Sequence, residues 1–201
     1  MTSLLPRLEA WLNAHYPTLL ADKAPGADEE ALEALEEQVG ARLPPDYKQL
    51  LAWHNGQNDT SAGLFGNWSL LGIEDVTNEW ELWKSIHDKG HLDDEAAELR
   101  APTGVKATWW HPRWIPISSD GMGNNHCLDL APEDGGQSGQ IIVLWHDYPG
   151  RQLLAPSLSA WIESILDRLE NGRYALVFDD EEEDYFFEPE GFIDEGALLS
   201  D

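Results

Sequence analysis

WIPISSDGMGNNHCLDL, residues 114–130, is the stretch that decides the fold of this chain. Apolar residues alternate with smaller or polar ones at both of its ends, at Ile115 and Ile117 and again at Leu128 and Leu130. An aspartate, two glycines and two asparagines lie between the ends, and these residue types form tight turns. The pattern predicts two strands joined by a polar hairpin tip.

The residues that follow extend this sheet and cover it. A β-branched run from Gln140 to His146 predicts a central, fully buried strand, and Arg151 to Leu154 predicts one more. From Ser157 to Asn171 the apolar residues recur every three or four positions, and Gly172 follows as a stop signal. This is the pattern of a helix that packs on the sheet.

The first half of the chain has helical spacing. We expect helices from Ser3 to His15, after Asp28, and from Leu43 to an Asn55-Gly56 end, with residues 16–27 as a connector. A short strand is predicted at Trp68 to Leu71, and a fourth helix after Asp75. Residues Asp93 to Leu99 suit one or two helical turns.

The charge of the chain limits its partners. Its 201 residues fit one domain, and 12 Lys and Arg against 38 Asp and Glu give a formal net charge of -26. This surface repels phosphate backbones, so it disfavours nucleic acid, and it attracts basic proteins. A general role of the acidity in solubility is the alternative to an acidic binding face.

Eleven of the acidic residues follow Gly172. We therefore divide the chain into a single α+β domain, residues 1–172, and an acidic C-terminal extension, residues 173–201. The extension has apolar aromatic stretches on both sides of six adjacent acids, which favours an edge hairpin over a mobile acidic arm. The sequence predicts no oligomeric state.

Other features point to a cytoplasmic protein. The first residues include Pro6, Arg7 and Glu9 and so lack the apolar core of a signal peptide, and no later run has the length of a membrane span. The single cysteine, Cys127, excludes an internal disulfide, and its strand setting favours a buried, inert thiol.

Three segments resemble the yeast cell-wall-assembly regulator family, whose bacterial relatives form the SUKH superfamily of toxin-immunity proteins. They are Leu43 to Leu51 leading to Asn55-Gly56, Leu70 to Trp80, and Trp114 to Leu130 followed by Gly139 to Val143 and His146-Asp147. The resemblance covers roughly residues 28–170. It implies an α+β fold, with a mainly antiparallel sheet flanked by helices, and no catalytic role. For bacterial relatives it implies neutralisation of a toxin, often a nuclease, and for fungal ones an interaction hub.

The residues themselves indicate no catalytic site. The sequence lacks a Gly-x-Ser-x-Gly elbow, a phosphate-binding loop with its lysine, and a His-Glu-x-x-His motif. The Asp120 to Asn125 loop is interpreted as a turn. We expect no cofactor and no metal, although a metal-dependent hydrolase remains the third alternative because five residues could converge on a metal: His54, His126, Asp129, His146 and Asp147.

We instead expect a protein-binding module without catalysis. The first hypothesis is an immunity protein that neutralises a basic toxin, such as a nuclease, and the second is a regulatory scaffold of the cell-wall-assembly type. Acidic and aromatic residues suit such a partner. The expected contact residues are Trp109, Trp110, Asp120, Asn124, Asp179, Asp180 and Glu181. Packing in the core is the alternative for the two tryptophans.

Overall fold

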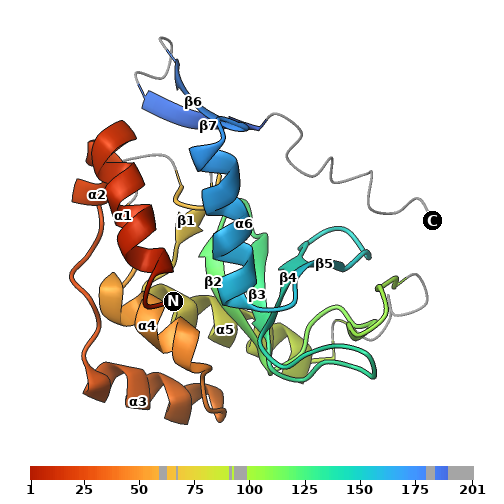
Figure 1. Ribbon diagram of the computed structural model, residues 1–201. Helices are drawn as coiled ribbons and strands as arrows, with labels where there is room; N and C mark the ends of the chain where they lie inside the picture. Colours follow the sequence, from red (N-terminus) through yellow and green to blue (C-terminus); the bar gives the residue numbers. More distant parts are fainter. Residues whose placement is uncertain (59–62, 67, 91, 93–98, 180–183, 190–201) are drawn as a thin grey trace.

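A five-stranded antiparallel sheet forms the centre of the protein in its computed structural model (Figure 1). The structure describes the chain except residues 59–62, 67, 91, 93–98, 180–183 and 190–201. The strands follow one another across the sheet in chain order: β1 (Ser69–Leu70), β2 (Trp114–Ser119), β3 (Asn125–Asp129), β4 (Gln140–Leu144) and β5 (Gln152–Ala155). The predicted hairpin is confirmed as β2 and β3.

The register of the sheet follows from its apolar pattern. Ile115 pairs with Leu128, and Cys127 pairs with Ile142. The register shifts between Pro116 and Ser118, next to a proline that has no N–H to donate to the ladder. Every residue of β3 and β4 is buried, which agrees with the predicted central strand.

Four helices precede or flank the first strand: α1 (Leu4–His15), α2 (Pro17–Ala21), α3 (Glu29–Val39) and α4 (Pro45–Trp53). Helix α3 begins where predicted, because the Asp28 carboxylate accepts a hydrogen bond of 2.9 Å from the Ala31 N–H. It ends at Val39, and the C-cap that follows is Gly40, whose φ is 63°. The connector predicted for residues 16–27 contains the short helix α2.

Helix α5 (Ile73–Asp88) begins earlier than the sequence predicts. Its N-cap is Gly72, which has no side chain to signal the start, and Asp75 lies inside the first turn. The helix buries Val76, Trp80 and Trp83 and packs against α3 and β2. Of the segment predicted to form helical turns, residues 93–98 lie outside the described residues.

Helix α6 (Leu158–Glu170) crosses the sheet as expected (Figure 1). The Ser157 hydroxyl caps it by accepting a 3.1 Å hydrogen bond from the Ala160 N–H. Its apolar stripe is buried against β4, β5, α1 and α4. The fold is therefore α+β, a mainly antiparallel sheet with flanking helices.

The C-terminal extension contains a β-hairpin. Strands β6 (Tyr174–Asp179) and β7 (Asp184–Pro189) pair with each other from Tyr174↔Pro189 to Asp179↔Asp184. They form a two-stranded sheet of their own, and β6 contacts the end of α6. The division of the chain at residue 172 stays a prediction.

Candidate functional site

An acidic cleft lies between α5 and the sheet. Residues three and four apart share a face of a helix, and here the shared face is Asp75, Asn78, Glu79 and Leu82. The opposite wall comes from β1, from the segment before it, and from the tip between β2 and β3. Its residues are Gln57, Asn58, Ser69, Leu70, Leu71, Ser119, Asp120 and Gly121. We call it the α5 cleft, and its volume is about 760 Å³.

Like charges face one another across the α5 cleft. Partial burial raises the pKa of the Glu79 carboxyl, and the negative charges of Asp75 and Asp120 raise it further. Among the described residues that line the cleft, none is a lysine or an arginine. Leu82 is 57% exposed at its rim. The cleft thus offers carboxylates and an exposed leucine, a surface that suits a lysine or arginine side chain.

The tip between β2 and β3 is held by its own side chains, as the sequence predicts. The Asp120 carboxylate accepts hydrogen bonds from the N–H of Met122 at 2.8 Å and of Asn124 at 3.1 Å. The Asn124 amide donates to the same carboxylate at 2.6 Å. Its carbonyl oxygen accepts from the backbone and the ring of His146. These bonds fix Asp120 at one wall of the α5 cleft.

Trp109 and Trp110 lie elsewhere, packed in the interior. Trp109 is 6% exposed, and the Arg151 guanidinium lies 5.1 Å from its ring centroid. Trp110 is 1% exposed and packs edge to face with Trp80, 6.1 Å between centroids. Both rings are buried, as the core-packing alternative expects. A contact of either ring with a partner stays a prediction.

The remaining expected contact residues belong to the C-terminal extension. Asp179 is the last residue of β6, and Asp180 and Glu181 lie outside the described residues. Of the expected contact residues, the structure thus brings Asp120 and Asn124 together. Asp75, Glu79 and Leu82 were not among the predicted contact residues. Their spacing on a second, polar stripe of α5 was the one signal available.

The histidines considered for a metal each have a separate structural partner. His54 is bound to the carbonyl of Ala24 at 2.9 Å, and His126 to the Ser118 hydroxyl at 2.6 Å. Asp129 accepts a 2.8 Å bond from Gln140. Across the described chain, no three His, Cys, Asp or Glu side chains come together as metal ligands would.

Cys127 has the predicted buried setting. It is fully buried in β3, and burial raises the pKa of its thiol well above the ordinary value, so the reactive thiolate does not form at neutral pH. No helix of the part that the structure describes combines the length and apolar character needed to cross a bilayer.

Several fungal regulators are similar to this chain. A cell wall biosynthesis/cell cycle regulator of Schizosaccharomyces pombe is 30% identical over 186 residues, which are 87% of this chain and 37% of that protein. A glucan synthesis regulatory protein of Neurospora crassa is 27% identical, with 88% of this chain and 40% of the relative covered. The cell wall assembly regulator SMI1 of Saccharomyces cerevisiae is 24% identical, with 89% and 42% covered.

These relatives are named as regulators and not as enzymes, and the chain spans about two fifths of their length. A family model provides the assignment. It describes the SMI1 / KNR4 family (SUKH-1) and matches residues 26–164, which are more than half of the chain. The chain therefore belongs to the SMI1/KNR4 family (SUKH-1).

Proposed function

We propose that this chain is a non-catalytic protein-binding module of a cytoplasmic regulator of cell-wall assembly, and that its α5 cleft holds a basic segment of the partner. The relatives' names support the regulatory part. The observation that carries the binding part is the cleft itself, where Asp75 and Asp120 both repel Glu79 and the described lining residues include no lysine or arginine.

A basic side chain would relieve this repulsion. Asp75 and Glu79 are four residues apart on one helix, an arrangement of like charges that destabilises an isolated helix by about 0.2–0.5 kcal/mol. A guanidinium between them and Asp120 replaces repulsion by charge-assisted hydrogen bonds. The exposed Leu82 can contact the aliphatic stem of the same side chain.

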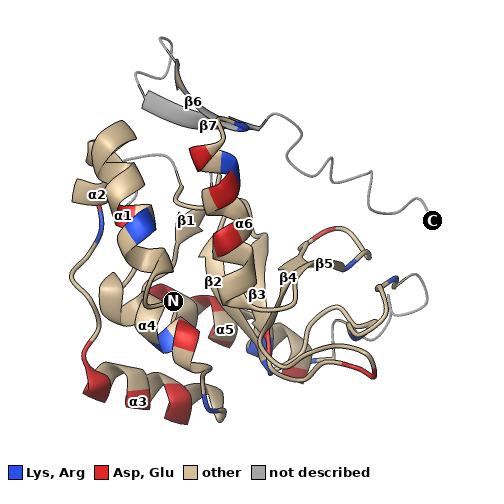
Figure 2. Ribbon diagram, viewed as in Figure 1, with Lys and Arg blue, Asp and Glu red and all other residues tan. Residues whose placement is uncertain are grey.

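The charge of the whole chain supports the same kind of partner. A net charge of -26 accelerates encounter with a basic protein and slows encounter with nucleic acid. Acidic residues cover several elements, most plainly α3 and α6 (Figure 2). The general surface therefore steers the partner, and the α5 cleft supplies the specific contact.

A toxin-neutralising role is the second candidate function. A toxin nuclease must be basic to bind phosphate, so its active surface would also fit the α5 cleft. The names of the fungal relatives favour the regulatory role. The two roles predict different captured proteins, either components of cell-wall regulation or a basic toxin domain.

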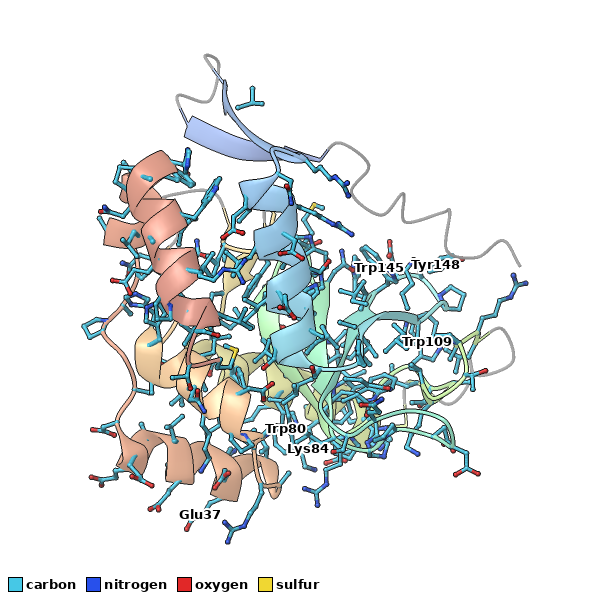
Figure 3. All side chains as sticks on the ribbon, viewed as in Figure 1. Glu37, Trp80, Lys84, Trp109, Trp145 and Tyr148 are labelled. Atoms are coloured by element: carbon cyan, nitrogen blue, oxygen red, sulfur yellow. The ribbon has the colours of Figure 1, made fainter. Side chains whose placement is uncertain are left out.

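The test uses the full chain as bait in an extract of its native host. A double variant, Asp75→Lys with Glu79→Lys, reverses the charge of the α5 cleft. The matched control, Glu33→Lys with Glu37→Lys, makes the same change at exposed positions with the same spacing on α3, where Glu37 points away from the body (Figure 3).

We expect the wild-type chain and the α3 control to retain the same basic proteins at low salt, and the cleft variant to lose them. Circular dichroism checks that both variants are folded. Retention of the same proteins by the cleft variant would overturn the role of the cleft. Equal loss of these proteins in both variants would show that net charge, and not the cleft, causes their binding.

A further inference from the structure

A second, chemically opposite surface lies between α6 and the far part of the sheet. One face of α6 supplies Trp161, Ser164, Ile165 and Arg168, again at helical spacing. The sheet and the residues next to it supply Trp68, His126, Val143, Trp145, Gln152 and Leu154. We call this surface the tryptophan groove.

The walls of the tryptophan groove are held in place by ring contacts. Trp68 stacks on His126 with 3.9 Å between centroids, and Trp145 meets Trp68 edge to face at 6.0 Å. Trp161 lies edge-on to the same histidine at 4.8 Å. His126 is itself bound to Ser118, so the aromatic walls are ordered before any partner arrives.

The free space in the groove sets the size of its occupant. It measures about 50 Å³. Since one water-sized group needs about 10–15 Å³ of such space, the groove holds roughly three to five of them. The branched side chain of leucine has four carbons, so one such side chain fits.

The charge of the groove is the reverse of that of the α5 cleft. None of the described aspartates and glutamates is among the residues that line the groove, and Arg168 contributes a positive charge to it. Within the described part of the chain, Arg168 takes part in no ion pair. A carboxylate next to an apolar occupant would pair with Arg168 and so strengthen binding.

We propose that the tryptophan groove binds a partner protein through one leucine-sized aliphatic side chain flanked by an aspartate or glutamate that pairs with Arg168. Tryptophan and arginine are the residue types that dominate binding energy at protein interfaces. Trp145, which lines the groove, and the 41% exposed Tyr148 lie on the side of α6 away from α3 (Figure 3). This second contact goes beyond the proposed function.

Salt dependence separates the two surfaces. A basic segment in the α5 cleft is attracted by the whole protein, so its affinity falls as salt rises. An acidic segment in the tryptophan groove is repelled by the net charge of -26 but paired locally with Arg168. Salt shortens the range of the repulsion to about 8 Å at 0.15 M, so binding in the groove should be unchanged or stronger at that salt than at 0.02 M.

The experiment is a two-dimensional NMR titration of the full chain, observing the indole N–H signals. The probe is the blocked peptide acetyl-Ser-Glu-Leu-Asp-Ser-amide. Two comparison peptides replace its leucine by alanine or its acids by lysines. We expect the probe to shift the signals of Trp68, Trp145 and Trp161, and each comparison peptide to bind at least tenfold more weakly.

Two variants locate the site. Arg168→Glu should weaken binding of the probe at least tenfold, while Arg42→Glu, the same change at an exposed position outside the groove, should not alter it. Ser164→Phe should fill the groove and abolish the shifts.

The proposal is overturned if the lysine peptide binds as well as the probe, if the probe causes no shift at millimolar concentration, or if the shifts persist in the folded Ser164→Phe variant. None of these outcomes bears on the α5 cleft.

Discussion

Gly56 lies against the backbone of Gly72, so closely that a Cβ atom on Gly56 would be 2.5 Å from the Gly72 nitrogen. Next to this contact, the side-chain oxygen of Asn55 accepts a 2.8 Å hydrogen bond from the N–H of Ile73. The Asn55-Gly56 pair therefore does more than follow α4. It attaches the segment after α4 to the beginning of α5 and so places one wall of the α5 cleft.

Gly56→Ala should lower the free energy of unfolding by more than about 2 kcal/mol. Gly56 has φ of 88°, a conformation that costs a residue with a side chain about 1–2 kcal/mol, and the added Cβ would also collide with the backbone of Gly72. Gly172→Ala is the control, because Gly172 has φ of 66° but open space around it. Urea unfolding should rank Gly56→Ala as the more destabilised. Equal losses would mean that the backbone contact is unimportant.

The elements that periodicity alone could predict are those that bury one regular stripe. The β2–β3 hairpin, β4 and α6 agree with the sequence because turn residues and capping side chains mark their ends. The start of α5 was misplaced because its cap is Gly72, whose backbone signals nothing in the sequence. The short α2 was missed for a similar reason, since it has no side-chain cap.

The candidate surfaces could not be predicted, because they are made by tertiary packing. The α5 cleft needs Glu79 to face Asp120, and the tryptophan groove joins Trp68 to side chains of α6. The choice between surface and core for Trp109 was also open in the sequence. Trp109 is buried against the guanidinium of Arg151, a residue that hydrophobic patterns would place outside.

Glu79→Gln should stabilise the protein at pH 7 by about 0.2–0.5 kcal/mol. A carboxyl whose pKa is raised on folding contributes stability that is present at low pH and is lost as pH rises through the raised pKa. The uncharged glutamine removes this loss. Thermal unfolding from pH 4 to 7 should show a smaller difference between variant and wild type at the acidic end. Asp134→Asn, an equal charge change in an exposed loop, should give no such pattern.

His126→Phe should weaken the loss of stability on acidification. Burial lowers the pKa of His126 to about 3 in the folded state. Between about pH 6.5 and 3, His126 is therefore protonated in the unfolded state but not in the folded state. Stability falls over that interval, by up to about 1.4 kcal/mol per pH unit for this one group. Unfolding of wild type and variant at pH 7 and pH 5 measures the contribution of His126 as the difference between the two losses. Identical losses in the two proteins would show that His126 is protonated in the folded state.

Arg151→Ala should be among the most destabilising single substitutions in this protein. Arg151 is 1% exposed. Its guanidinium donates hydrogen bonds to the carbonyls of Tyr148 at 2.8 Å, Gly150 at 2.9 Å and Trp109 at 2.8 Å. Removing it leaves buried acceptors unpaired, at about 1–3 kcal/mol for each that water cannot reach, and removes the packing on Trp109.

Arg151→Lys should recover only part of the loss, because one ammonium cannot reproduce the planar fork. Arg100→Ala, at an exposed position of the adjoining segment, is the control and should change the unfolding free energy by less than about 0.5 kcal/mol. If Arg151→Lys were as stable as the wild type in urea, the fork geometry would be irrelevant and charge alone would account for the site.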